Sequence, residues 1–306
     1  MVNVSVVIPL LNEETLVDEL VLRVKQNLNF TNDNFEIIIV DDGSSDDTWT
    51  KILKVATQDK RIKGIRFSRN FGHHYAITSG LEHSSGEWVV VMDGDLQDRP
   101  EVIPDLYKEA QKGFDIVFVS RKRRPESIFY RILQKTFYFT LRILSGIKFD
   151  STQANYSILN RKVVNAFKMF PENARFYGST VNWLGFKRSK IYADHGTRFS
   201  GKPSYSLKKR LKLAGDVIFA FSDRALWWTI YIGLLMSLFS FILLTYILVR
   251  AYFSGFEVLG WASVIASIYF VGGIILTVVG VVGIYISKIF TEVKRRPLYV
   301  VQETIN

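Results

Sequence analysis

Short apolar runs rich in β-branched residues alternate with amphipathic stretches between residues 4 and 120. Such runs, bounded by turn-forming residues, are typical of buried strands, and apolar residues that recur every three or four positions indicate helices. The alternation predicts an α/β fold with a mostly parallel sheet and helices on both faces. The predicted strands are 4–9, 35–40, 62–67, 89–92 and 116–120. The predicted helices are 12–27, 46–56 and 75–82.

The second half of the chain is far more apolar. Residues 227–249 contain no charged residue, and neither do residues 258–287. Each run is long enough to cross a hydrocarbon core of about 30 Å as a helix. The pattern therefore predicts two transmembrane helices, at 227–250 and 258–287.

Two amphipathic stretches come before these spans. Within residues 127–145, Arg131, Lys135 and Arg142 form a narrow basic stripe on an otherwise apolar helix, which is typical of a helix lying among lipid headgroups. Residues 206–226 predict a juxtamembrane helix. A helix facing a protein core is the alternative for both stretches, and the wide apolar side of the first favours a membrane or tight burial in protein. The predicted domains are 1–205, 206–226, 227–250, 258–287 and a cytoplasmic tail at 288–306.

The distribution of charge predicts the orientation in the membrane. No Lys or Arg occurs in residues 251–260, whereas Lys288, Lys294, Arg295 and Arg296 follow the second span. Basic segments stay on the cytoplasmic side, so we expect the catalytic part and both termini there. The net charge of +10 suits an anionic membrane surface as well as nucleic acid. With two spans present, the membrane explains it and no nucleic-acid partner is expected.

Residue usage adds two expectations. The chain has no cysteine, which excludes disulfides and thiolate metal sites. Glycine recurs in the second span, where it costs helix stability and allows helices to approach closely. We therefore predict a homo-oligomer, although the first span of the same chain is an alternative partner. These glycines are Gly272, Gly273, Gly280 and Gly283.

The predicted strand at 89–92 ends at Asp93-Gly94-Asp95. Ligands of open α/β sheets bind beyond the carboxyl ends of the strands. Two carboxylates there are the hard oxygen ligands that Mg²⁺ or Mn²⁺ prefers, and the metal could carry a diphosphate. The alternative is a strand end capped by turn-forming residues.

The strand at 35–40 has the same layout, because it ends at Asp41 and Asp42 before a glycine. The first strand ends in another polar loop, with Glu13. Three polar loops are therefore expected on one rim of the sheet. A carboxylate there could accept from the N–H of a nucleotide base, while a metal at Asp93 and Asp95 stabilises the diphosphate leaving group.

Five segments together resemble the family 2 glycosyltransferases with the GT-A fold, and in particular the polyisoprenyl-phosphate glycosyltransferases. The likeness runs from residue 4 to about residue 226, and the two spans agree with the bacterial two-span members. The segments are VVIPLLNE (6–13), IVDDGS (39–44), SRNFG (68–72), MDGDLQ (92–97) and RFSGKPSY (198–205).

The resemblance implies roles for individual residues. The nucleotide would be bound by Pro9, Leu11, Glu13, Asp41, Asp42 and Asp93. The metal would be bound by Asp93, Asp95 and Gln97. Phosphate would be bound by Arg121, Arg131 and Arg198, since an arginine fork pairs bidentately with phosphate. The groups expected to carry catalysis are Asp93, Asp95, Arg131 and Arg198. Asn155 stands where the family commonly has an aspartate, which puts the choice of sugar in question.

The activity implied is a metal-dependent, inverting transfer of a hexose onto a polyprenyl phosphate at the bacterial cytoplasmic membrane. Glucose from UDP-glucose and undecaprenyl phosphate are the expected donor and acceptor. A processive polysaccharide synthase is one alternative, disfavoured by having only two spans. A non-catalytic, membrane-tethered protein that binds nucleotide sugars is another, disfavoured because both metal carboxylates are present. His73 and His74 are adjacent and point apart on a helix, so no ligand role is predicted for them.

Overall fold

The computed structural model describes residues 2–121, 153–170, 172, 176–193, 224–254 and 260–306. They fall into two compact units. The sheet unit combines the N-terminal half of the chain with residues 296–306, and the helical unit contains residues 224–295. The domain boundaries expected from the sequence stay a prediction.

The sheet unit is built on one eight-stranded sheet with the order β7-β5-β6-β4-β1-β2-β3-β8. Strands β4, β1, β2 and β3 are parallel neighbours, as the sequence predicts. The sheet is mixed rather than mostly parallel, because β6 runs antiparallel between β4 and β5 and β8 runs antiparallel to β3. The strands are β1 Val4–Leu10, β2 Phe35–Asp41, β3 Ile62–Phe67, β4 Trp88–Val91, β5 Ile116–Arg121, β6 Gln153–Asn160, β7 Arg188–Ala193 and β8 Val301–Ile305.

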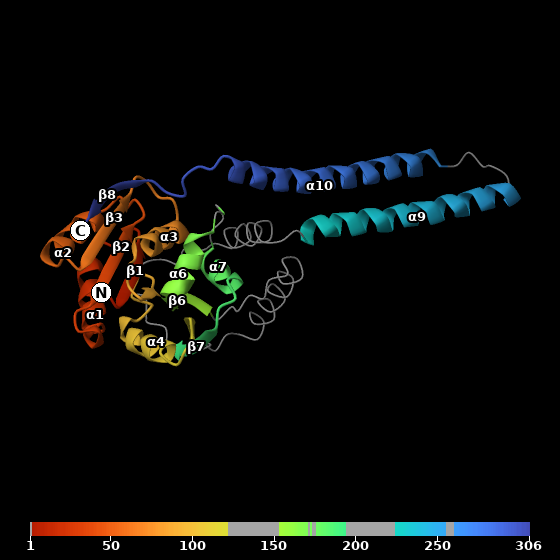
Figure 1. The fold of residues 1–306 in the computed structure, drawn as a ribbon. Coiled ribbons are helices and arrows are strands. Elements are labelled where there is room, and N and C mark those ends of the chain that lie inside the picture. The colour runs from red at the N-terminus through yellow and green to blue at the C-terminus, as the bar shows by residue number, and fades with distance from the viewer. Residues whose placement is uncertain (1, 122–152, 171, 173–175, 194–223, 255–259) are drawn as a thin grey trace. The chain divides into compact units, whose positions relative to one another are not determined.

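Helices cover both faces of this sheet, so two apolar cores form (Figure 1). Helices α1, α2 and α4 bury their apolar sides in one core, and α3, α6 and α7 bury theirs in the other. Neighbouring strand residues alternate between the cores: Ile37 and Ile39 belong to the first, and Ile38 to the second. This alternation explains why β1 and β2 read as continuous apolar runs. The helices are α1 Val17–Gln26, α2 Thr48–Gln58, α3 His73–His83, α4 Ile103–Ala110, α6 Arg161–Lys168 and α7 Tyr177–Trp183.

Two elements differ from the sequence prediction. Helix α1 begins at Val17 rather than at Asn12, because Asn12 has a positive φ of 56° and the N–H groups of Asn12 and Glu14 donate to Ser44 and Asp46 of the loop after β2. Residues 288–306 are predicted only as a tail, yet they contain the end of α10 and the strand β8. The blue strand β8 lies beside the orange strand β3, although more than half the chain separates them (Figure 1).

The helical unit contains two long helices in contact with each other, α9 Arg224–Ser254 and α10 Trp261–Val293. Their large apolar side chains are widely exposed, for example Phe239 at 66% and Leu276 at 74%. Among the described residues, one stretch is long and apolar enough to cross a membrane, Phe270–Val293. The predicted amphipathic helix at 127–145 lies outside the described residues, and so does 206–223.

Candidate active site

The loops after β1 and β2 are joined to each other by hydrogen bonds at the carboxyl end of the sheet. The Asn12 N–H donates to Ser44 Oγ at 2.9 Å, and the Ser45 N–H donates to Asn12 Oδ1 at 2.9 Å. The Glu13 N–H donates to Thr48 Oγ1, also at 2.9 Å. Strands β1, β2 and β4 end together at this rim, as expected for parallel neighbours.

Asp42 connects the β2 loop to the loop between β3 and α3. Its carboxylate accepts from the N–H groups of Phe71 at 2.8 Å and Gly72 at 3.0 Å. The two loops also pack backbone to backbone, since a Cβ built on Gly43 would lie 2.3 Å from the carbonyl carbon of Arg69. Burial raises the pKa of Asp42, and the two N–H donors only partly oppose it. Asp42 therefore holds the 68–72 loop in place from inside the rim.

Asp41 is fully buried, and its carboxylate contacts Ser44 and Arg66. Its Oδ1 accepts from the Ser44 N–H at 3.0 Å, and its Oδ2 lies 3.6 Å from Arg66 Nε. These contacts give Asp41 a part in shaping the turn. Its expected nucleotide contact stays a prediction.

Asp93 faces His73, the first residue of α3. His73 Nε2 lies 3.2 Å from Asp93 Oδ1, and the Asn155 side-chain amide lies 3.5 Å from the same His73 nitrogen. Burial lowers the pKa of His73, but the hydrogen bond and charge of Asp93 outweigh it, so the pKa is raised overall. The structure thus brings together Asp93, His73 and Asn155. The sequence prediction missed this role of His73.

The Asp93-Gly94-Asp95 loop is tightly folded over the end of β1. The Asp93 N–H donates to Asp98 Oδ2 at 3.1 Å, and the Gln97 N–H donates to Asp95 Oδ1 at 3.0 Å. A Cβ on Gly94 would lie 2.0 Å from Leu10 Cδ2 and 3.2 Å from the Pro9 carbonyl oxygen, so the loop lies close against the end of β1.

These contacts bear on the expected metal. Within the described ranges, no group of three or more Asp, Glu or His is placed to hold a metal by itself. Two carboxylates nevertheless fit Mg²⁺, which commonly takes one or two protein carboxylates and completes its shell with substrate phosphate and water. Asp93 and Asp95 are both partly exposed at the rim. The metal role of Asp93, Asp95 and Gln97 stays a prediction.

The other predicted residues are spread along the chain. Pro9 is buried in β1 opposite Val40, whereas Leu11 is 39% exposed just beyond that strand. Arg121 is the last residue of β5, and its backbone pairs with Ala193 of β7. The two predicted acceptor residues, Arg131 and Arg198, lie outside the described residues.

Comparison with known proteins shows to which family this chain belongs. Residues 5–170, more than half of the chain, match the family described as Glycosyl transferase family 2. The chain belongs to glycosyl transferase family 2.

Relatives of this glycosyltransferase match it along nearly its whole length. An uncharacterized glycosyltransferase of Bacillus subtilis, YkcC, is 36% identical, over 99% of this chain and 94% of the relative. The prophage-derived bactoprenol glucosyl transferase of Shigella flexneri is 32% identical, over 99% of this chain and 98% of the relative. The resemblance found in the sequence motifs is therefore confirmed, and the protein is an enzyme of the glycosyltransferase class.

A solved structure supports the fold. Glucosyl-3-phosphoglycerate synthase from Mycobacterium tuberculosis superposes with a TM-score of 0.52 at 19% identity, over 72% of this chain and 79% of the other. The α/β sheet unit accordingly has the predicted GT-A fold, in its mixed-sheet form.

Proposed function

We propose that this glycosyltransferase transfers glucose from UDP-glucose to a polyprenyl phosphate, with undecaprenyl phosphate as the expected acceptor. The observation that carries the proposal is the full-length similarity to a protein named as a bactoprenol glucosyl transferase, at 32% identity. The rim of strand ends supports it, because a nucleotide diphosphate would lie there beside Asp93 and Asp95.

A divalent metal, Mg²⁺ or Mn²⁺, would be held by Asp93, Asp95 and Gln97. The structural relative from Mycobacterium tuberculosis was solved with Mn²⁺ and UDP, at a TM-score of 0.51. When bound, such a metal stabilises a diphosphate leaving group. The partly exposed carboxylates at the end of β4 would supply the oxygen ligands that this role requires.

The acceptor removes the need for a strong base at the site. A phosphate monoester has a second pKa of about 6, so it is largely dianionic near pH 7 and already nucleophilic. We propose that its oxygen attacks the anomeric carbon in line with the departing diphosphate, which inverts the configuration. Asn155, which reaches His73, would then orient the sugar through hydrogen bonds rather than accept a proton.

We further propose that α9 and α10 both span the membrane. Strands β7 and β8 belong to one sheet, and α9 and α10 lie between them in sequence. A sheet lies on one side of a bilayer, so the chain between Ala193 and Val301 would cross an even number of times. A crossing by α10 would therefore require another. Helix α9 has 31 residues, and a helix of that length measures about 46 Å.

An even number of crossings also supports the predicted location. The sheet unit and the chain after α10 would share one side, and the basic residues that follow the second span favour the cytoplasmic side of a bacterial inner membrane. The predicted homo-oligomer is also retained as a proposal. Among the described residues, nothing lies within 4 Å of a Cβ built on Gly280, so this part of α10 leaves room for a second copy. Crosslinking in mild detergent should show species above the monomer, and a purely monomeric active enzyme would exclude them.

A transfer assay tests the function directly. Purified protein is given Mg²⁺ or Mn²⁺, polyprenyl phosphate and a panel of labelled UDP- and GDP-sugars, and label is counted in the organic phase. We expect transfer from UDP-glucose that is abolished by EDTA and by Asp95→Ala. Asp105→Ala, which removes an exposed carboxylate on α4, is the matched control and should retain activity. Label in water-soluble polymer instead would favour the polysaccharide synthase, and no transfer from any sugar would contradict the proposal.

A further inference from the structure

The residues that follow α10 pack against the loops of the candidate site. We call residues 299–306 the return segment. Its strand β8 pairs with β3, and the register shifts at Arg66 and Phe67. Just beyond the shift, the Ser68 N–H donates to the Val300 carbonyl at 3.0 Å. The return segment therefore contacts the start of the 68–72 loop through the backbone.

Tyr299 reinforces this contact with its side chain. Its ring stacks on Phe67 with centroids 4.7 Å apart and an angle of 16° between the planes. Phe67 in turn contacts Phe71 edge to face at 5.7 Å. The Tyr299 hydroxyl donates to the carboxylate of Glu82, near the end of α3. One side chain thus joins the strand before the loop to the helix after it.

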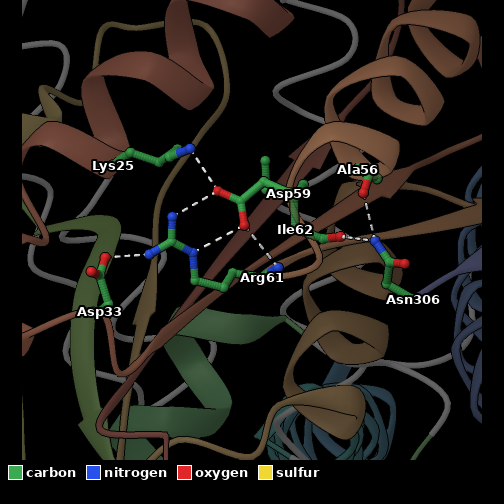
Figure 2. Close-up of polar contacts among 7 residues, drawn as sticks. All are labelled: Lys25, Asp33, Ala56, Asp59, Arg61, Ile62 and Asn306. Carbon is green, nitrogen blue, oxygen red and sulfur yellow. Dashed lines mark hydrogen bonds and ion pairs between the residues drawn. The ribbon is translucent and has the colours of Figure 1, made fainter.

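The other end of the return segment is attached to α2 and to the start of β3. The side-chain amide of Asn306 donates to the carbonyls of Ala56 and Ile62, both at 2.8 Å (Figure 2). Ile305 packs into the core between Trp49 and Ile52, where a Cβ on Gly64 would lie 2.8 Å from its Cγ2. Among the described residues, this end bonds to Ala56 and Ile62 and makes no hydrogen bond to the 68–72 loop.

The 68–72 loop reaches the site on its opposite side. The Phe71 N–H bonds to Asp42 at 2.8 Å, and Gly72 leads into His73, which lies 3.2 Å from Asp93. Any movement of the loop would therefore displace its contact with Asp42 and the contact of His73 with Asp93.

We propose that Tyr299 positions the 68–72 loop, so that donor binding depends on a residue that follows the helical unit. This inference rests on the proposed function, since it takes the rim as the nucleotide site. Tyr299 is a positioning residue that acts through Phe67 and Phe71. Without its ring and hydroxyl, the loop would be less ordered, and part of the binding energy of the nucleotide would go into ordering it.

The test uses the full-length protein in detergent, with UDP and Mn²⁺ as the probe and titration calorimetry as the readout. Tyr299→Ala should weaken UDP binding roughly tenfold, which corresponds to the loss of one stacking contact and one hydrogen bond. Tyr299→Phe keeps the ring and should stay within about threefold of the wild type. In the transfer assay, the KM for the donor should rise in Tyr299→Ala while kcat changes little.

Two controls separate positioning from general destabilisation. Gln302→Ala alters an exposed side chain of β8 and should have no effect. Ile305→Ala should lower the unfolding temperature, because it leaves a gap in the core, but it should bind UDP as the wild type does. Equal weakening by Tyr299→Ala and Ile305→Ala, or unchanged binding in Tyr299→Ala, would overturn the inference. If the wild type itself binds no UDP or other nucleotide, the proposed function fails and the inference fails with it.

Discussion

Helix α3 packs on β1 at a point where only glycine fits. A Cβ built on Gly80 would lie 2.2 Å from Val7 Cγ1 and 3.2 Å from Val7 Cβ. Val7 is fully buried and β-branched, so its side chain has little freedom to turn away. Because α3 begins at His73, this contact also determines where His73 lies relative to Asp93.

Gly80→Ala should therefore destabilise the sheet unit even though alanine is the better helix former. Carbon atoms pack best about 3.5–4.0 Å apart, so α3 or Val7 must move by more than about 1 Å. Such overpacking costs about 1–3 kcal/mol, and the gain in helix propensity returns about 1 kcal/mol. A net loss of about 1 kcal/mol should lower the unfolding temperature by about 2–4 °C in a unit of this size. Activity should also fall, because His73 moves with the helix.

A double-mutant cycle with Val7→Ala checks the reasoning. Val7→Ala alone should cost about 2 kcal/mol, for the lost burial and the cavity left behind. Together with Gly80→Ala it should cost clearly less than the sum of the two, because the new methyl group fills that cavity. Thermal unfolding followed by intrinsic fluorescence gives the four values. A Gly80→Ala protein as stable as the wild type, or strictly additive effects, would show that the contact does not constrain α3.

Three further predictions concern the buried Glu36, the buried His74 and the two arginines expected at the acceptor phosphate. Glu36→Gln should lower the free energy of unfolding by about 2 kcal/mol and spare activity at 20 °C, because this buried carboxylate accepts from Ser5 and Ser85 and pairs with Lys63. Urea unfolding measures the loss of stability, and a change under about 0.5 kcal/mol would contradict the prediction. Burial lowers the pKa of His74 to about 4. In the unfolded chain the same imidazole becomes protonated below about pH 6.5, so acid favours the unfolded state. The free energy of unfolding should fall by up to about 3 kcal/mol between pH 6.5 and 4. The fall should be smaller in His74→Gln, and parallel plots of unfolding free energy against pH for the two proteins would refute this. Arg131→Ala and Arg198→Ala should raise the KM for polyprenyl phosphate more than the Kd for UDP, and the reverse pattern would reassign both arginines.

Much of the sheet and the rim could be predicted because their signals are local. Apolar runs that stop at Asp41 and Asp93 indicate strands whose carboxyl ends meet, and the structure confirms that these ends lie together. His73 was missed for a tertiary reason. Asp93 belongs to the loop after β4, so its 3.2 Å contact with His73 depends on how α3 packs on the sheet and not on the local sequence around His73.

Strand β8 shows where sequence reasoning stops. Its five residues include three polar ones, and nothing local marks them as part of a sheet. The strand exists because β3 offers unpaired backbone groups at the sheet edge, and that partner is far away in sequence. At the acceptor phosphate, Arg131 is expected from its place in the basic stripe of residues 127–145 as well as from likeness to the family. Arg198 is expected from likeness to the family alone.

The pairing of β3 with β8 also has a consequence for how the protein is made. Until β8 arrives, β3 presents an open edge, and open edges are prone to pair with other chains and aggregate. The ribosome completes α9 and α10 before it makes β8, so the sheet is closed only after both helices have left it. Contacts of such long sequence separation form slowly. A chain whose apolar helices fail to reach their proper place would keep this edge exposed, and quality-control proteases and chaperones could recognise it there.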